Sequence, residues 1–523
     1  MPPKPTQSME PSAPAGSDVH DAGVLFAEDR RSWWKKPHLL QLNLMVFSCL
    51  LFSSANGYDG TLMNGLQALP PWQSFMHHPK GGWLGFINAA QAMGSIIAGY
   101  PAAWTGKTFG RKTGIYLAYM FLTIGTTLQT AAPNPGCFIT ARVFVGFATQ
   151  FFGNSAPVLV TEIAYPSHRG IVTALYQCGW YVGSLIAAWA TFGVRDYTTS
   201  WSWRIPSLLQ IAIPLLTLPG FLFAPESPRY LIAKDRIDEA KNILVRYHGG
   251  GVQDAMISLE IEEIIHTLRA EHEAKKANSW SDMLKTKGNR HRTLISITLG
   301  IFAQWNGVGV VSYYLVLVLQ AAGVTAVRDQ TLLNGCLQIW NLILSVGAAF
   351  SVDRFGRRRL FLTSAVGMLI SYICITGLSG SFDETGVASV GIAVIPFLFL
   401  FYGFYDIAFT PLTISYTAEI WPYGLRIQGM ALVQISTQLA VFFNIFVNPI
   451  ALDAIGWKYY IVFVAILVVI IATIWVFYPE TKGHTLEEMA TIFDTDDAAG
   501  ALALSGTKKK GTDVETAHIE TAT

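Results

Sequence analysis

The chain has 523 residues, of which 51% are hydrophobic and only 14% are charged, and its formal net charge is +1. The hydrophobic share is slightly above, and the charged share well below, the average of soluble domains. The composition therefore indicates a membrane protein. The near-zero net charge gives no support for a nucleic-acid or polyanionic partner. The five cysteines show no disulfide or metal-ligand spacing, and we expect no cofactor and no metal site.

The N-terminal tail is polar. Residues 1–38 are rich in proline, serine, alanine and charge and contain no apolar core, which predicts a disordered cytoplasmic tail rather than a signal peptide. Trp33 and Trp34 beside Lys35 and Lys36 suit a membrane interface that anchors the first helix. The alternative, that they are ordinary flanking residues, stays open.

Twelve apolar runs of about 20 residues, the length needed to cross a bilayer, follow the tail. Six begin near Leu39, Gly82, Thr113, Gly136, Ile171 and Trp203, and six more begin near Thr293, Gln330, Leu360, Ala388, Ile427 and Trp457. We predict an all-α membrane protein with twelve transmembrane helices, six in residues 39–223 and six in residues 293–478. Gly94 and Gly146 would let the second and fourth helices approach closely.

The interval 224–292 resembles soluble protein. Residues 235–247 predict a helix with Ile237, Ala240, Ile243 and Leu244 on one face, and residues 256–268 predict a second amphipathic helix. Because they contain few apolar residues, we expect short cytoplasmic helices packed under the membrane domain and no separate catalytic domain. Residues 479–523 turn polar and predict a cytoplasmic C-terminal tail.

Three pairs of motifs indicate that the chain is a duplication. The turn at residues 353–359 repeats a weaker copy at 107–112, offset by 246 positions, and Pro479-Glu480 repeats Pro225-Glu226, offset by 254. Glu162 precedes Arg169 by seven residues, as Glu419 precedes Arg426 in the second half. Three pairs in one order predict two parallel six-helix repeats.

The charged turn at residues 353–359 sets the orientation. It carries four arginines between two apolar runs and cannot lie in lipid. The positive-inside rule therefore places it in the cytoplasm, and an even number of crossings returns both termini to that side.

Asp59 is the sharpest intramembrane candidate. It lies at the far end of the first helix in Gly57-Tyr58-Asp59-Gly60, and an intramembrane ionisable residue marks a functional site by default. We interpret it as a proton carrier. The alternative is a hydrated residue at a helix end.

Uncharged amides and aromatic rings recur inside the predicted helices. The amides offer donors and an acceptor to a neutral, hydroxyl-rich ligand, and the rings offer flat faces on which a sugar could stack. The predicted substrate-binding residues are Gln177, Gln304, Asn306, Asn341, Asn444, Tyr313, Tyr314 and Trp340. For any single amide, a hydrogen bond that only joins two helices is an equal alternative.

The motifs together resemble the sugar porter family of the major facilitator superfamily over about residues 40–485. They include Gly57-Tyr58-Asp59, Glu162 to Arg169-Gly170, Pro225-Glu226-Ser227-Pro228-Arg229, the turn at 353–359 and Pro479-Glu480-Thr481-Lys482-Gly483. The seventh helix, from Gln304-Trp305-Asn306-Gly307, looks most like fungal lactose-permease, cellodextrin and hexose transporters. The resemblance implies two six-helix bundles around a central sugar site that opens alternately to either side.

The resemblance also assigns roles to single residues. Gln177, Gln304 and Asn341 match the family's sugar-binding amides, and Asp59 matches the acid linked to proton coupling in symporters. Charged residues of these motifs are expected to form ion-pair networks that join helices on the cytoplasmic side and govern gating. They are Arg111, Arg142, Glu162, Arg169, Glu226, Arg229, Asp353, Arg354, Arg357, Glu419, Arg426 and Glu480.

Some positions depart from the family pattern. Ala303 and Gly309 stand where the family has a glutamine and an asparagine, and Ile414 stands where many hexose carriers have a tryptophan. A roomier disaccharide site is therefore plausible. Lys107 replaces the acidic residue of the first arginine turn, so the N-terminal network should have different or weaker contacts than the C-terminal one.

The sequence thus predicts a plasma-membrane sugar transporter that works as a monomer in the bilayer. We expect it to be a proton symporter, and its substrate to be a disaccharide of the lactose or cellobiose type or a hexose. Two alternatives are a carrier of another polyhydroxylated solute, such as a polyol, quinate or a secondary metabolite, and a sugar sensor that does not transport. An enzyme is not expected, because no nucleophile with a base, metal cluster or phosphate loop is evident.

Overall fold

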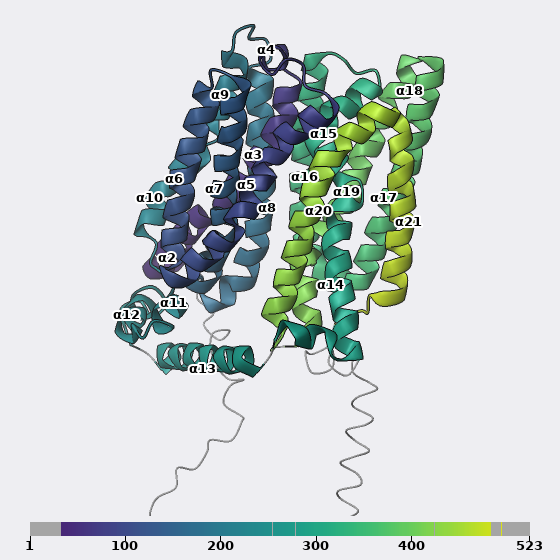
Figure 1. Ribbon diagram of the computed structural model, residues 1–523. Helices are drawn as coiled ribbons and strands as arrows, with labels where there is room; N and C mark the ends of the chain where they lie inside the picture. The colour runs from purple at the N-terminus through teal and green to yellow at the C-terminus, as the bar shows by residue number, and fades with distance from the viewer. Residues whose placement is uncertain (1–32, 254, 278, 423, 483–492, 494–523) are drawn as a thin grey trace, which may run out of the picture.

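The computed structural model describes residues 33–253, 255–277, 279–422, 424–482 and 493. Every regular element among these residues is a helix, which confirms the predicted all-α fold. The long helices form two groups that stand side by side, with short helices beneath them (Figure 1).

The N-terminal group contains six helical passages. They are α2 (Pro37–Leu50) with α3 (Phe52–Gln67), α5 (Gly81–Thr108), α6 (Arg111–Ala131), α7 (Pro135–Ile163), α8 (Arg169–Gly193), and α9 (Trp201–Leu209) with α10 (Ala212–Phe223). The short helix α4 (Pro70–Phe75) connects the first passage to the second.

The C-terminal group contains six more. They are α14 (Lys287–Trp305) with α15 (Val308–Ala321), α16 (Val327–Phe355), α17 (Arg357–Thr385), α18 (Ala388–Ile392) with α19 (Val394–Ile420), α20 (Arg426–Ile455) and α21 (Tyr459–Phe477). The described residues therefore form the twelve passages that the sequence predicts.

Eight stretches of the described residues are long and apolar enough to cross a membrane, and one of them, 426–477, holds both α20 and α21. The helices α5, α6 and α8 fall outside this set, yet α5 and α6 pack against α7, and α8 packs against α3. The chain is accordingly a multi-pass membrane protein.

Short helices connect the two groups at one end of the molecule. They are α11 (Pro228–Ile232), α12 (Ile237–Tyr247), α13 (Ala255–Ala277) and η4 (Trp280–Leu284). We call this end the linker end, and we call the end where α3 runs into α4 the opposite end (Figure 1). Ala240 and Leu244 are buried in the apolar cluster of the linker as predicted, but Ile237 is 42% exposed, because it begins α12 outside that cluster.

Glycines bring the helices of the N-terminal group into backbone contact, as predicted for Gly94 and Gly146. A Cβ on Gly94 would stand 2.2 Å from the carbonyl oxygen of Val143, and one on Gly146 would stand 2.1 Å from that of Gln91. The helices α5 and α7 therefore touch along their backbones. The same holds for α3 and α8, where a Cβ on Gly183 would stand 1.8 Å from a backbone oxygen of α3.

The seventh passage is broken between α14 and α15. Gly307 has φ +101°, and its carbonyl accepts a hydrogen bond of 2.9 Å from the hydroxyl of Tyr372. A Cβ at this position would stand 2.4 Å from that ring, so only glycine fits here. The break leaves backbone groups of α14 and α15 free for side chains of other helices.

The two groups contact each other through α3 and α15, α5 and α20, and α8 and α16. At the opposite end, Asn64 of α3 accepts a hydrogen bond of 3.0 Å from the backbone N–H of Leu315. Gln67 donates one of 3.0 Å to the carbonyl of Tyr313, beside the non-helical residue Tyr314. These bonds fasten α3 to α15 at the opposite end.

Candidate functional site

Asp59 lies at the centre of a buried polar cluster in the N-terminal group. The side chain is fully buried, and its Oδ1 accepts hydrogen bonds from Arg142 of α7 and from Gln210, the latter at 2.8 Å. Arg142 is also buried, and a second guanidinium nitrogen lies 3.3 Å from the amide oxygen of Gln91 on α5. The other carboxylate oxygen of Asp59 has no hydrogen-bond partner among the described residues.

The structure corrects the expected place of Arg142. We predicted this arginine within the cytoplasmic network, but its partner is Asp59, in the helix interior. The physical reason is depth: Arg142 and Glu162 lie 20 positions apart on the same helix, α7, which separates them by about 30 Å along its axis. Gln210, at the junction of α9 and α10, was not predicted, although an amide within an apolar run was visible.

The amides of the seventh and eleventh passages meet at the break between α14 and α15. Asn444 of α20 donates a hydrogen bond of 2.8 Å to the backbone carbonyl of Gln304. Asn306 is fully buried; its side-chain oxygen accepts from Val308 N–H at 2.9 Å, while its amide nitrogen has no partner among the described residues. A Cβ on Gly309 would stand 2.0 Å from Asn444, so the Asn444 side chain occupies the space of the missing side chain.

Gln177 and Asn341 lie on the packed helices α8 and α16. Asn341 is buried, and neither side-chain polar atom has a partner among the described residues. Gln177 is exposed. Cys178 and Ser345, close to them in sequence, approach each other at 3.6 Å and show that the two helices touch across the groups.

The three predicted aromatic residues lie on α15 and α16. Trp340 donates a hydrogen bond of 2.8 Å to the carbonyl of Phe399, and Tyr314 donates one of 2.5 Å to the carbonyl of Ile445. Both polar atoms are thus engaged within the C-terminal group. Tyr313 and Trp340 are half-buried, whereas Tyr314 is buried.

A second buried carboxyl group, Asp406 of α19, was not among the predicted site residues. It is fully buried, and its Oδ1 accepts hydrogen bonds from the hydroxyl of Tyr181 on α8 and from Thr410, the latter at 2.9 Å. Its second oxygen has no hydrogen-bond partner among the described residues. Sequence reasoning missed the pair because Tyr181 lies in the other half of the chain.

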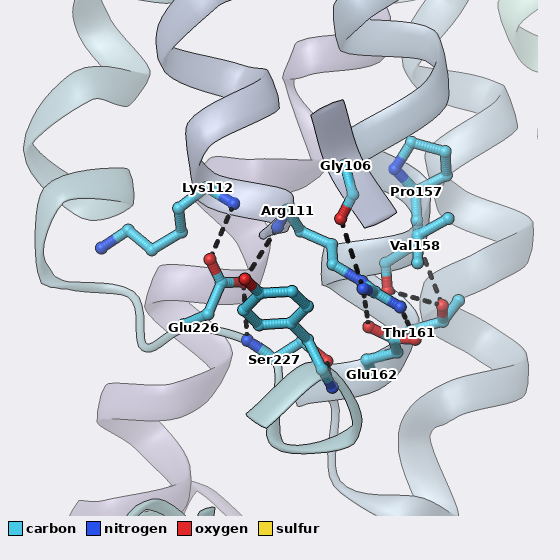
Figure 2. Close-up of polar contacts among 10 residues, drawn as sticks. Gly106, Arg111, Lys112, Pro157, Val158, Thr161, Glu162, Glu226 and Ser227 are labelled. Carbon is cyan, nitrogen blue, oxygen red and sulfur yellow. Dashed lines mark hydrogen bonds and ion pairs between the residues drawn. The ribbon is translucent and has the colours of Figure 1, made fainter. Parts of the chain in front are cut away.

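The N-terminal charge network lies at the linker end (Figure 2). Arg111 forms a two-pronged ion pair with Glu162, at 2.9 and 3.0 Å. Glu226 accepts backbone N–H bonds from Arg111, Lys112 and Ser227, at 3.2, 3.1 and 2.9 Å. Burial raises the pKa of Glu226, and the three N–H donors only partly offset this.

The C-terminal group repeats this arrangement. Arg357 pairs with Glu419 at 3.0 Å, and Glu480 accepts backbone N–H bonds from Arg357, Thr481 and Lys482, at 2.8, 3.1 and 3.1 Å. Each half therefore has one glutamate that pairs with an arginine and one that caps a helix N-terminus. The repeat that the sequence predicts is present in the geometry of the side chains.

Arg169 contacts the linker and not Glu162, which stands seven residues earlier. It lies 2.9 Å from Glu260 of α13, while Glu162 pairs with Arg111. The reason is the turn η3 (Pro166–His168) after α7, from which Arg169 begins α8 towards the linker. Arg229 lies on α11, close enough to influence the charge of Arg169.

Three predicted gating residues of the C-terminal half are less defined. Arg426 begins α20, and its side chain is half-buried. Asp353 and Arg354 continue the backbone of α16 to its end, but their side chains lie outside the described residues.

The arrangement offers two kinds of chemistry. A buried carboxylate that pairs with a buried guanidinium can bind a proton, and binding the proton breaks the ion pair. The pair is stable only while both groups are charged. Amides, a tyrosine ring and hydroxyls near the boundary of the two groups can bind a neutral polyhydroxylated molecule. Among the described residues no group of histidine, cysteine and carboxylate side chains could hold a metal ion.

The chain is similar to known proteins along most of its length. The family described as "Sugar (and other) transporter" matches residues 45–493. A high-affinity glucose transporter of Kluyveromyces lactis is 26% identical over 478 residues, covering 88% of this chain and 86% of that protein. The MFS-type transporter oryC of Aspergillus oryzae is 26% identical over 467 residues, covering 87% and 86%.

Solved structures share the fold. The inward-open xylose transporter XylE of E. coli superposes with a TM-score of 0.71 at 22% identity, and the match covers 86% of this chain and 99% of XylE. The two groups of six passages thus have the major facilitator arrangement.

Proposed function

Because the chain belongs to the sugar transporter family, we propose that it carries a neutral sugar across the membrane together with a proton. The halves rock around a central site, so that the site opens alternately to either side. The observation that carries this proposal is the buried set of Asp59, Arg142 and Gln210.

Asp59 is the proposed proton carrier. Removing one partner of a buried ion pair costs about 3–5 kcal/mol, so an ionised Asp59 keeps Arg142 in place. A proton on Asp59 cancels that attraction and frees the guanidinium to move. Proton binding then changes the contacts between α3 and α7. Both helices belong to the N-terminal group, so this change can be coupled to the rocking of that group.

The proposed sugar site lies where α8, α14, α15, α16 and α20 meet near the boundary of the groups. Unpaired buried amides support it: both polar atoms of Asn341 and the amide nitrogen of Asn306 have no partner among the described residues. Buried polar groups are normally hydrogen-bonded, so such atoms favour a ligand that supplies the partners. We extend the site to Gln177, Gln304, Tyr313 and Asn444.

The proposed substrates are a hexose or a disaccharide of the lactose or cellobiose type. Several relatives are named as glucose transporters, which favours a hexose. Ile414 stands where many hexose carriers have a tryptophan, which keeps a disaccharide among the candidates, although Asn444 fills the space beside Gly309. Uptake of both classes has to be measured.

We further propose that the linker end faces the cytoplasm of a plasma-membrane protein that works as a monomer. The basic residues of both arginine turns, at 107–112 and 353–359, support this orientation through the positive-inside rule. In this arrangement the bonds from Asn64 and Gln67 to α15 hold the outer end closed.

The test is uptake of labelled glucose, lactose and cellobiose into cells that lack their own carriers, at about pH 5 and about pH 8 outside, with and without a protonophore. A proton moving inward gains about 2.3 kcal/mol per about 100 mV, so symport should accumulate sugar at low external pH and lose this with the protonophore. Asp59→Asn should abolish accumulation but spare sugar exchange.

Asp329→Asn is the matched control, because Asp329 is an exposed carboxylate at the start of α16. It should accumulate sugar like the parent. Full accumulation by Asp59→Asn would disprove proton coupling at this residue. If the parent transports no sugar at all, the protein instead carries another polyhydroxylated solute or senses sugar without transport.

A further inference from the structure

His248, at the end of α12, joins three elements of the linker end. The side chain is buried, with 7% of the residue exposed. Its Nδ1 lies 2.9 Å from Oε2 of Glu260 on α13, and its Nε2 lies 3.2 Å from the backbone carbonyl oxygen of Ile163, the last residue of α7. Glu260 also lies 2.9 Å from Arg169 of α8. We call His248, Glu260, Arg169 and the Ile163 carbonyl the linker clamp.

The two partners of His248 decide its protonation. A carboxylate and a carbonyl only accept hydrogen bonds, so both contacts are hydrogen bonds only when both ring nitrogens carry a proton. A neutral imidazole has one N–H and one lone pair, so one of its nitrogens would face an acceptor without a hydrogen between them. In a buried position no water replaces the lost bond. The geometry therefore matches the imidazolium.

The groups around the clamp favour this charge. Burial opposes the charge of Glu260, but His248 and Arg169 outweigh burial and lower the pKa of Glu260, which keeps it ionised. Other titratable groups are near: Arg229 and Glu263 act on Arg169, and the Tyr165 ring lies 5.5 Å from His248 and 5.7 Å from His168. The carboxylate that touches His248 directly is Glu260.

We propose that protonated His248 fastens α13 to the N-terminal group, and that its deprotonation, as pH on the linker side rises, loosens α13. The helix lies along the linker end beneath the N-terminal group, and one of its ends points towards the C-terminal group (Figure 1). Because α13 belongs to the linker between the two halves, loosening it weakens the connection between them at the linker end. The clamp is a pH sensor separate from Asp59 and from the proton that would be transported.

The direct test is hydrogen exchange of the full-length protein in lipid nanodiscs. Exchange of residues 255–268 is measured between about pH 5.5 and about pH 8, the range over which histidines change charge, and is corrected for the pH dependence of unstructured peptides. The parent should lose protection of this segment several-fold as pH rises. His248→Gln, which carries no charge, should show the weaker protection at every pH.

His266→Gln is the matched control, because His266 is an exposed histidine on the same helix. It should keep the pH dependence of the parent. Protection of the parent that does not change with pH overturns the proposal whether or not His248→Gln folds. So does a pH dependence that survives in His248→Gln. This readout needs no transport, so its failure is separate from a failure of the proposed function.

Discussion

The hydroxyl of Tyr181 donates a hydrogen bond to the carboxylate of Asp406, and these residues lie 225 positions apart in opposite halves of the chain. Both side chains are buried, and Thr410 donates a second bond to the same oxygen. The two groups of helices are therefore joined through a buried carboxyl group. Any motion that separates α8 from α19 must break this bond.

Tyr181→Phe should weaken the closed arrangement, because it removes a donor from a buried carboxylate. The loss of a buried partner costs about 1–3 kcal/mol. We expect slower cross-linking of two cysteines placed opposite each other on α8 and α19, because the helices separate more often, and a lower melting temperature. Tyr197→Phe removes an exposed hydroxyl and serves as the control. Equal melting and cross-linking in both variants would contradict a joining role for Tyr181.

Arg142→Gln should lower the stability of the fold more than the double variant Asp59→Asn with Arg142→Gln does. The single change leaves a buried carboxylate without its cation, at a cost of about 3–5 kcal/mol, whereas the double change removes both charges. Melting of the purified protein in detergent should show the single variant as the least stable. Arg290→Gln, at an exposed arginine of α14, should melt like the parent. A double variant less stable than Arg142→Gln would argue against a paired charge.

The repeat could be predicted from the sequence because it rests on short motifs. Glu162 and Glu419 occupy equivalent places beside arginines, and Glu226 and Glu480 cap equivalent helices. The apolar runs likewise predicted the helices, since run length depends only on the membrane thickness.

Partners across the fold could not be predicted in the same way. Which acid Arg142 meets depends on how α3 crosses α7, and the bond between Tyr181 and Asp406 depends on how the two halves dock. Neither is encoded in local spacing. The depth of Arg142 along α7 was available from the residue count, however, and already placed it far from Glu162.

Gly110→Ala and Gly356→Ala should each damage the linker end. Both glycines combine a positive φ, +104° and +87°, with an extended ψ, a conformation nearly restricted to glycine that costs other residues about 1–3 kcal/mol. A Cβ would also stand 2.4 Å from Glu226 at position 110 and 2.7 Å from Glu480 at position 356.

We expect lower melting temperatures and reduced transport from both variants. Gly99→Ala is the control, because a Cβ on this helical glycine meets no atom within 4 Å. It should be neutral or slightly stabilising, since alanine favours helix. Melting of Gly110→Ala and Gly356→Ala at the temperature of Gly99→Ala would show that the turns tolerate a side chain.

The attachment of α13 should weaken at acid pH when Glu260 becomes protonated, and we call this loss the acid limit. Its pKa in the folded protein is lowered, because His248 and Arg169 outweigh burial. A carboxyl with a lowered folded pKa stabilises the fold fully above its unfolded pKa, and this stabilisation is lost as pH falls through the folded value. Protection of residues 255–268 against hydrogen exchange should therefore fall at acid pH, below the ordinary glutamate range.

Glu260→Gln should remove this acid limit, because a glutamine does not titrate, and should weaken the protection at neutral pH. Glu262→Gln changes an exposed carboxyl on the same helix and should leave the acid limit unchanged. Together with deprotonation of His248 at high pH, the loss of the Glu260 charge gives α13 a window of greatest protection bounded on both sides. A Glu260→Gln protein that keeps the acid limit would place its origin in another carboxyl of the linker.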